Sequence, residues 1–515
     1  MPVTLLWADD EIELLKPHVM FLEHKGYVVE TVTNGKDAID KVKEKHFDIV
    51  FLDENMPGLN GLETLSQIKD LYPALPIVMI TKSEEEAIME EAIGSKISDY
   101  LIKPVNPNQI LLTLKKNLDD KRLVSEKTTS GYQQEFRQIG MQLGSRMDTE
   151  EWTDLYRKLV KWELQLEGSE EESMDEIFRM QKSEANHQFC KFVEQNYEDW
   201  VNAKGDDIPL MSHNLFKNKI APLVKEGKTF MVLIDNLRFD QWRSIRPLLS
   251  DLYRVENEDL YYSILPTATQ YSRNAIFSGL MPAEMEKLNP ELWLNDEDEG
   301  GKNMNEKEFL EKQLVRLGLN KKVSYNKITN LQAGKKLLEN FNNLLNNDLN
   351  VIVYNFVDML SHARTDMEVI RELADDESAY RSLTLSWFEH SPLRSILQKI
   401  AEAGIPLIIT TDHGTVHVKN PVKVVGDKNT NTNLRYKRGK NLSYDPKEVM
   451  EVKDPTALRL PKQHMSTRFI FAKNSDFFAY PNNYNHYVRY YKDTFQHGGI
   501  SLEEMLIPVV YLKPL

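Results

Sequence analysis

The sequence is poor in cysteine and in positive charge. Cys190 is the only cysteine in 515 residues, which excludes a disulfide framework and a thiolate metal site. The formal net charge of -15 argues against a chain-wide electrostatic grip on nucleic acid, although a local basic patch is compatible with it. No run of about 18 apolar residues can cross a bilayer, and no signal peptide opens the chain. We therefore expect a cytoplasmic protein without membrane insertion.

A helix-turn-helix with a basic recognition face is also missing, which counts against a DNA-binding regulator. With 515 residues, of which 41% are hydrophobic, the chain is long enough for several packed cores. We divide it into residues 1–122, 123–204 and 205–515 and expect an α/β multidomain fold with a helical middle part.

Short apolar segments and helical patterns alternate five times in the first 122 residues. The expected strands are 4–8, 28–32, 49–52, 77–80 and 100–102, and the expected helices include 36–45, 62–71, 84–92 and one that begins at 107. Such alternation predicts a parallel sheet with helices on both faces.

Polar residues follow four of these five strands. Asp9 and Asp10 come after the first, Asp53 after the third, Thr81 after the fourth and Lys103 after the fifth. Three carboxylates at one edge repel each other unless a cation lies between them, and Mg²⁺ suits such a cluster. Asp53 can then accept a phosphoryl group, to which Thr81 donates a hydrogen bond and which Lys103 neutralises. Helix caps and a solvated lysine are the structural alternative.

These residues resemble those of a response-regulator receiver domain. The matching segments are Asp9-Asp10, Leu52-Asp53-Glu54-Asn55-Met56-Pro57-Gly58, Thr81 and Tyr100-Leu101-Ile102-Lys103-Pro104. The resemblance implies a flavodoxin-like, CheY-like fold in which a sensor histidine kinase phosphorylates Asp53. It implies that Mg²⁺ is bound by Asp9, Asp10, Asp53 and the carbonyl of Asn55. It also implies that the residues of the conformational switch are Thr81, Tyr100 and Lys103.

One position departs from the receiver pattern. Receivers usually carry a small residue after the switch threonine, whereas this chain has Lys82. Access to the phosphate, and with it the rate of dephosphorylation, is therefore expected to be unusual.

Residues 123–204 favour helices. The segment from 133 onward contains almost no proline, and its apolar residues follow helical spacing at Trp152, Leu155, Leu159, Trp162 and Leu166. This pattern predicts a helical bundle. A spacer that fixes domain geometry and a partner-binding surface both explain it.

In residues 205–515, acidic and imidazole side chains follow predicted strands. The strands are expected at 230–234, 351–357 and 406–409, and the six side chains are Asp235, Asp358, His362, Asp412, His413 and His497. Six such ligands can hold two divalent ions about 4 Å apart, which is an arrangement for phosphoryl transfer. Oxygen and imidazole ligands without thiolate suit Zn²⁺ or Mn²⁺. A structural role for these residues is the alternative.

Thr267 and Thr269 lie in a turn that opens a helix. The positive field at a helix start favours an attacking alkoxide or a bound phosphate. Helix capping is the other interpretation of each threonine.

This part of the chain resembles the PglZ-type branch of the alkaline phosphatase superfamily. The resemblance rests on Ile234-Asp235-Asn236-Leu237-Arg238, Leu265-Pro266-Thr267-Ala268-Thr269, Asp358 with His362, Thr411-Asp412-His413-Gly414 and His497-Gly498-Gly499. It implies an α/β fold with one metal on Asp235, Asp412 and His413 beside Thr269. It implies a second metal on Asp358, His362 and His497. Thr269 is then the nucleophile that forms a covalent phosphothreonine.

A long polar insertion at 416–464 contains a basic segment in an otherwise acidic protein. Arg435 and Lys437 can bind phosphates and Tyr436 can stack on a base, whereas a solvated loop explains the segment equally well. If the segment faces the metals, the substrate is a phosphodiester or an oligonucleotide rather than a small monoester.

The order of the three parts resembles the PorX-type response regulators of bacterial type IX secretion. The resemblance implies zinc in the last domain, phosphodiesterase activity on linear or cyclic oligonucleotides, and contacts with a sigma factor or the secretion machinery. We also expect a homodimer that depends on phosphorylation. The rival hypothesis is a non-catalytic, metal-stabilised binding module that acts through protein contacts alone.

Overall fold

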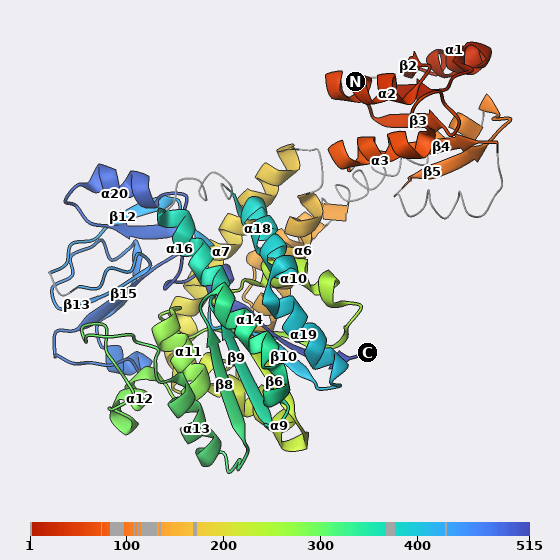
Figure 1. Cartoon of the computed structure of the whole chain (residues 1–515). Coiled ribbons are helices and arrows are strands. Elements are labelled where there is room, and N and C mark those ends of the chain that lie inside the picture. Colours follow the sequence, from red (N-terminus) through yellow and green to blue (C-terminus); the bar gives the residue numbers. More distant parts are fainter. Residues whose placement is uncertain are drawn as a thin grey trace. The chain divides into compact units, whose positions relative to one another are not determined.

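The computed structural model describes residues 3–515, apart from 74, 83–96, 108, 112, 115–130, 133–134, 168–171, 367–375 and 428–429. The side chains of 172–173 and 362–366 also lie outside this description. The chain forms two compact units, residues 1–133 and 134–515 (Figure 1). Among the described helices, none has the length and hydropathy that a membrane span requires.

The first unit contains a parallel five-stranded sheet of the order β2-β1-β3-β4-β5. Its strands are β1 (Thr4–Ala8), β2 (Val28–Val32), β3 (Ile49–Asp53), β4 (Ile77–Thr81) and β5 (Asp99–Ile102). This arrangement confirms the parallel sheet that the alternating pattern predicts, and it agrees with the CheY-like fold that the receiver resemblance implies.

Helices pack on both faces of this sheet because successive strand residues point to opposite sides. Leu6 and Ala8 of β1 join the core beneath two helices, whereas Leu5 and Trp7 join the core on the other face. The described helices are α1 (Lys16–His24), α2 (Gly35–Glu44) and α3 (Gly61–Leu71). The predicted helix at 84–92, and most of the one that begins at 107, lie outside the described residues.

The middle of the chain is helical, as predicted. The long helices are α6 (Thr149–Leu166) and α7 (Glu172–Val201), and residues 135–143 are also helical. A capping box starts α6, because the Asp148 carboxylate accepts from the Glu151 amide and the Glu151 carboxylate accepts from the Asp148 amide. The apolar residues with helical spacing are all buried: Trp152, Leu155, Leu159, Trp162 and Leu166. Both helices belong to the second compact unit.

A six-stranded sheet of the order β7-β18-β10-β6-β9-β8 forms the centre of the second unit. The strands are β6 (Thr229–Ile234), β7 (Tyr253–Tyr262), β8 (Val323–Ile328), β9 (Leu349–Tyr354), β10 (Leu407–Thr410) and β18 (Leu506–Pro514). Strands β8, β9, β6 and β10 are parallel, whereas β18 runs antiparallel to both β10 and β7. Every residue of β6, β9 and β10 is buried, which explains their continuous apolar sequences.

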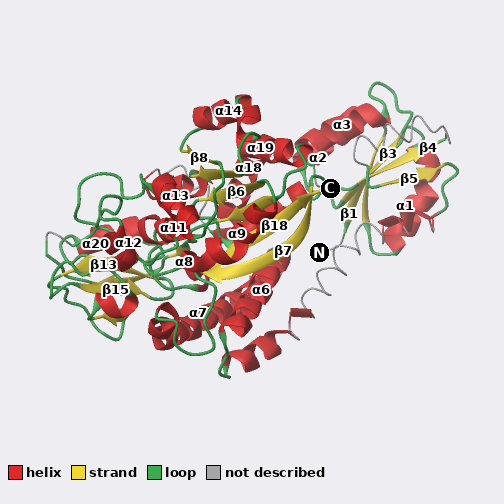
Figure 2. Ribbon diagram, turned by 90° about the horizontal axis from the view of Figure 1, so that it is seen from below, coloured by secondary structure: helices red, strands yellow, loops and turns green. Residues whose placement is uncertain are grey.

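Helices cover both faces of this sheet (Figure 2). Further described helices of the second unit are α8 (Ser212–Leu215), α9 (Ala221–Glu226), α10 (Phe239–Ile245), α11 (Thr269–Ser278), α12 (Pro282–Leu288), α13 (Glu306–Arg316), α14 (Leu331–Glu339), α15 (Phe341–Leu344), α16 (Phe356–Asp366), α18 (Glu377–His390), α19 (Pro392–Glu402) and α21 (Leu502–Met505). Of these, α12 packs on α11.

The polar insertion folds into small sheets rather than a loop. Strands β13 (Tyr436–Gly439), β15 (Arg468–Ala472) and β14 (Val449–Val452) form one sheet. Two further pairs are β11 (Val416–His417) with β17 (Phe495–Gln496), and β12 (Asn420–Lys423) with β16 (Asp476–Ala479). Helix α20 (Tyr484–Tyr491) packs on β16. Buried residues such as Ile470 and Phe478 supply the apolar core that this insertion needs.

Candidate functional site

The candidate site lies where three parallel strands end. Asp235 directly follows β6, Asp358 lies in the first turn of α16 after β9, and Asp412 follows β10. The carboxyl ends of parallel strands meet at one sheet edge, where open α/β sheets place their ligands. His413 continues the loop after β10 and His497 directly follows β17. The fold therefore brings residues from distant parts of the sequence to one place.

Short distances join these side chains. Ligand atoms of Asp235, Asp412 and His413 all lie within 4.8 Å of one another. The rings of His413 and His497 stack with centroids 4.1 Å apart. His497 Nε2 in turn lies 3.7 Å from Asp358 Oδ1. The two predicted ligand groups are thus adjacent, with the imidazoles between them.

Both histidines present the nitrogen that a metal needs. His413 Nδ1 lies 3.1 Å from the carbonyl oxygen of Gly414, and His497 Nδ1 lies 3.1 Å from that of Thr267. A carbonyl oxygen only accepts, so in each neutral ring Nδ1 carries the proton and Nε2 has the free electron pair. The Nε2 atoms are those that face the aspartates.

Thr269 is the first residue of α11 and reaches the same group. Its Oγ1 lies 3.1 Å from His413 Nε2, and because that nitrogen accepts, the hydroxyl donates. Thr267 is placed differently: it is fully buried, donates to the Gly499 carbonyl at 2.8 Å and accepts from the Gly498 amide at 3.0 Å. Of the two threonines, Thr269 has the hydroxyl beside the candidate ligands.

Arg273 is a site residue that the sequence reasoning missed. Its guanidinium is fully buried, forms an ion pair with Asp235 and donates from Nε to Asp412 Oδ2 at 2.9 Å. Its position one helical turn after Thr269 was the available signal, because residues four apart share a helix face.

The pKa values of Asp235 and Asp412 are shifted in opposite directions, although burial acts on both groups in the same way. Burial and the neighbouring carboxylates raise the pKa of Asp235, although Arg273 opposes this. Burial also disfavours the charge of Asp412, but Arg273, His413 and backbone donors lower its pKa to about 2. Asp235 Oδ1 is buried and accepts no hydrogen bond. A divalent cation supplies the partner that this oxygen lacks, so the donor set fits a metal.

His362 lies on α16, four residues after Asp358, and its side chain is outside the described part of the chain. Its predicted place in the second ligand group therefore stays a prediction.

The predicted substrate-binding residues Arg435, Tyr436 and Lys437 do not form the solvent-facing segment that the sequence suggested. Arg435 is fully buried and ion-paired with Glu504 at 2.6 Å, so it is not available to a substrate phosphate. Tyr436 is also buried and packs edge-on against Tyr271. Lys437 donates to the Asn431 carbonyl at 2.8 Å, and burial lowers its pKa to about 8. These three side chains stabilise the insertion rather than forming a solvent-facing basic patch.

The receiver residues converge at the carboxyl edge of the first sheet. Ligand atoms of Asp9, Asp10 and Asp53 lie within 4.8 Å of one another. Lys103 Nζ lies 2.7 Å from Asp53 and 2.9 Å from Asp9. Burial raises the pKa of Asp53 even though Lys103 opposes the shift. A cation at this cluster would offset the repulsion among the three carboxylates.

The other receiver positions lie on or directly after strands β3, β4 and β5. Thr81 ends β4 and donates to the Glu54 carboxylate, and Asn55 lies two residues beyond β3. Tyr100 is 40% exposed on β5. Lys82 is exposed and lies 3.4 Å from the Glu11 carboxylate.

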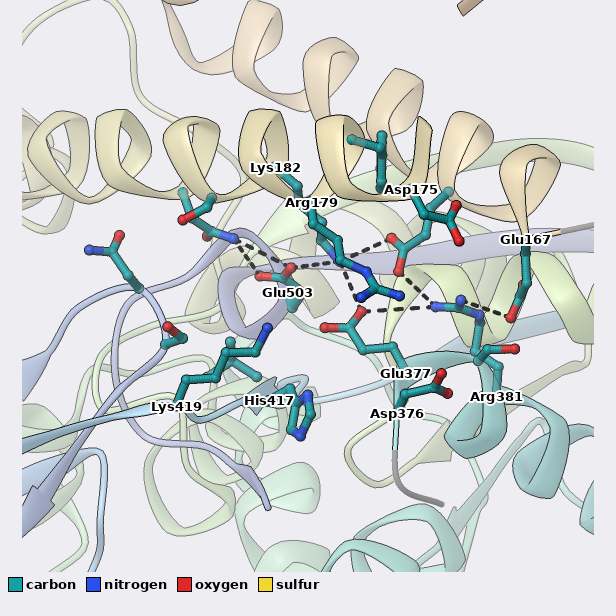
Figure 3. Close-up of a pocket in the computed structure, with 18 residues that line it drawn as sticks. Glu167, Asp175, Arg179, Lys182, Asp376, Glu377, Arg381, His417, Lys419 and Glu503 are labelled. Atoms are coloured by element: carbon teal, nitrogen blue, oxygen red, sulfur yellow. Dashed lines mark hydrogen bonds and ion pairs between the residues drawn. The ribbon is translucent and has the colours of Figure 1, made fainter. Parts of the chain in front are cut away.

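A buried ion network joins the linker helices to the last domain (Figure 3). Lys182 of α7 lies 2.9 Å from Glu163 of α6, 2.9 Å from Glu377 of α18 and 3.0 Å from Glu503 of α21. These residues line a cavity of about 460 Å³. The backbone of Glu503 also lies close to the loop that carries Asp412 and His413, because a Cβ on Gly414 would lie 2.0 Å from the Glu503 carbonyl oxygen.

Three family models match the chain in succession. They are the response regulator receiver domain at residues 5–115, the PorX response regulator linker domain at 122–201, and the BREX system PglZ alkaline phosphatase-like domain at 215–512. The last covers more than half of the chain.

Relatives match the receiver part. ZraR of Klebsiella oxytoca, a transcriptional regulatory protein, is 35% identical over 138 residues, which is 27% of this chain and 31% of that protein. ResD of Bacillus subtilis is 35% identical over 111 residues, or 22% of this chain and 46% of that protein. The chain thus spans less than half of the length of these curated relatives. The solved structure of Vibrio cholerae CheY4 shares 30% identity at a TM-score of 0.22, covering 23% of this chain and 100% of its own.

Receiver and alkaline phosphatase-like domains in one chain define a two-component response regulator that carries a PglZ domain. The chain belongs to the PglZ alkaline phosphatase-like family, and its order of receiver, linker and PglZ domain is that of the PorX-type response regulators. Domains of these two kinds use divalent metals, and a sensor kinase is the general phosphodonor of a receiver.

Proposed function

We propose that residues 205–515 form a two-metal phosphodiesterase that acts on linear or cyclic oligonucleotides and is regulated by residues 1–122. The observation that carries this proposal is the contact of Thr269 Oγ1 with His413 Nε2 at 3.1 Å, in the midst of Asp235, Asp412 and the stacked His497. A structural cap needs no such ring of ligands around its hydroxyl.

The residues divide into two groups for metal binding. Asp235, Asp412 and His413 would hold one ion, and Asp358 and His497 would hold the other together with His362. When bound, zinc or manganese ions polarise the phosphoryl group and stabilise negative charge on the attacking and leaving oxygens.

The reaction consists of two displacements at phosphorus. Thr269 Oγ loses its proton and bonds to phosphorus while the bond to the leaving alkoxide breaks, and that alkoxide takes up a proton. Water then attacks the phosphothreonyl diester, which releases the phosphomonoester and returns the proton to Thr269. Thr269 is the first residue of α11, and the positive end of that helix dipole favours the negative charge of both transition states.

Thr269→Ala and Thr269→Ser test this mechanism against bis(4-nitrophenyl) phosphate, with bound zinc quantified in each protein. We expect Ala to abolish turnover at unchanged metal content, and Ser to retain part of it because it keeps an Oγ. Turnover by the Ala variant at the wild-type rate would overturn the role of Thr269. Absence of turnover in a fully metallated wild type would favour the non-catalytic binding module.

The receiver part of the proposal concerns Asp53. A sensor histidine kinase would phosphorylate it, with Mg²⁺ on Asp9, Asp10, Asp53 and the carbonyl of Asn55, while Thr81, Tyr100 and Lys103 respond as the switch. Phosphorylation would then favour a homodimer and change access to the metal site. Sedimentation with and without beryllofluoride tests this, and Asp53→Asn is the control. Unchanged mass and unchanged turnover together would contradict it.

The PorX-type architecture is the ground for proposing a role in type IX secretion, with a sigma factor or the secretion machinery as partner.

A further inference from the structure

Helix α20 carries an aromatic and basic face that the site described above does not use. Residues 480–492 contain five of the 21 tyrosines of the chain, together with His486, Arg489 and Lys492. They contain no Asp or Glu, although a 13-residue stretch of this chain would hold about two on average, since acids make up 79 of 515 residues. Arg489 and Lys492 thus give this stretch a local positive charge within a protein of net charge -15, although Asp493 follows it directly.

The helix turns one face inward and leaves another in solvent. Tyr484, Val488 and Tyr491 follow helical spacing and pack on the buried residues of β11 and β16. On the other side, His486, Arg489 and Tyr487 are exposed, and Tyr490 lies between buried and exposed. Solvent-exposed aromatic rings lack the stabilisation that burial would provide. Several of them on one side of a helix therefore indicate a contact surface.

These rings form two parallel pairs that are steeply inclined to each other, since His486 lies at 67° to Tyr487 and Tyr490 at 85° to Tyr491. His486 and Tyr490 have centroids 6.3 Å apart at an interplanar angle of 19°, and Tyr487 and Tyr491 are 6.2 Å apart at 11°. Rings on the exposed side of the helix offer flat faces for nucleobases, and the exposed Arg489 supplies a positive charge for a phosphate. A protein partner would be met by aliphatic residues as well, whereas this face presents histidine, tyrosine, asparagine and arginine.

The helix is tied closely to the metal-binding loops. It packs on β11, which begins three residues after His413, and the six residues that follow Tyr491 end at His497. Six residues span at most about 20 Å, which is the length of about six nucleotides at the 3.4 Å rise of a stacked strand. A single strand of that length therefore reaches from the helix to the metal site.

We propose that the exposed face of α20 binds single-stranded nucleic acid by stacking bases on Tyr487, Tyr490 and His486, with Arg489 at the phosphates. The role of the bound strand as substrate rests on the phosphodiesterase proposed above, whereas binding itself does not. The face replaces Arg435, Tyr436 and Lys437 as the surface that selects an oligonucleotide over a small diester.

The test measures fluorescence anisotropy of a labelled 12-nucleotide oligothymidine with metal-loaded protein in the Thr269→Ala background. We expect Tyr487→Ala and Tyr490→Ala each to weaken binding about tenfold. The Tyr487→Phe/Tyr490→Phe double variant should bind with the affinity of the parent protein, because stacking needs only the aromatic ring. Arg489→Gln should lower the slope of log affinity against log salt by about 0.7. Tyr72→Ala, which alters a 42% exposed tyrosine of the first unit, is the matched control.

Hydrolysis separates the two proposals. With Thr269 intact, the α20 variants should lose activity on the 12-mer and keep that on bis(4-nitrophenyl) phosphate. If the α20 variants weaken binding of the 12-mer but the wild type hydrolyses neither diester, the proposed nucleic-acid surface is supported and the proposed phosphodiesterase activity is refuted. The proposed surface is refuted if the wild type does not bind the 12-mer. It is also refuted if the Tyr487→Ala/Tyr490→Ala double variant binds the 12-mer as the wild type does, even where that variant loses binding to a protein partner.

Discussion

Lys182→Met should destabilise the second unit strongly. The Lys182 side chain is 11% exposed, and its ammonium group neutralises Glu163, Glu377 and Glu503 at 2.9 to 3.0 Å. Methionine keeps the apolar stem and removes the charge, which leaves Glu377, Glu503 and the ionised fraction of Glu163 without one of their cations. Removing one member of a buried ion pair costs about 3–5 kcal/mol, and Arg238 and Arg381 remain to limit the loss.

Guanidinium unfolding of the full chain, followed by tryptophan fluorescence, measures the effect on the transition of residues 134–515. Lys191→Met is the matched control, because Lys191 lies on the same helix α7 and is exposed. We expect a change below about 0.5 kcal/mol for the control. If the two variants lose equal stability, the network does not hold the linker helices to the last domain.

Three further results follow from buried groups. Burial raises the pKa of Glu163 from 4.5 to about 7. Its contribution to the free energy of unfolding, about 3 kcal/mol, is therefore complete below pH 4.5 and is lost as the pH rises to about 7. Glu163→Gln should remove that fall from unfolding free energies measured at pH 5 and pH 7.5, and an unchanged fall would contradict it. Gly414→Ala should cost about 1–3 kcal/mol or more in the same unfolding assay, because the new Cβ would meet the Glu503 carbonyl at 2.0 Å, and an unaltered stability would show that the backbone gives way. Burial raises the pKa of Cys190 to about 12, so Ellman's reagent at pH 8 should label it only after denaturation, and rapid labelling of the native chain would refute its burial.

The sequence predicted the first sheet, three central strands of the second sheet and the sheet edge at which the candidate ligands lie, because these depend on local patterns. An apolar run followed by an acid marks the end of a buried parallel strand, and the rule that such ends share one edge brings Asp235 and Asp412 together. The same rule brings Asp53 near Asp9 in the first unit. The helical spacing of Trp152 and Leu159 likewise predicted which face of α6 is buried.

Interactions between distant residues were beyond this reasoning. Arg435 is basic in sequence but buried in the fold, because its partner Glu504 lies 69 residues further along the chain. Arg273 likewise has its role through Asp235 and Asp412, which come from two other loops. Polarity alone does not tell whether a charged side chain meets solvent or an opposite charge. The aromatic face of α20 was visible only once the helix showed which of its sides is buried.

The count of zinc ions by native mass spectrometry tests the central claim most directly, in the wild type and in Asp412→Asn and Asp358→Asn. The two-metal site predicts two ions per chain in the wild type and the loss of one in each variant, because the aspartates belong to different ligand groups. One ion in the wild type, or two ions retained in both variants, would contradict a two-metal site built from these residues.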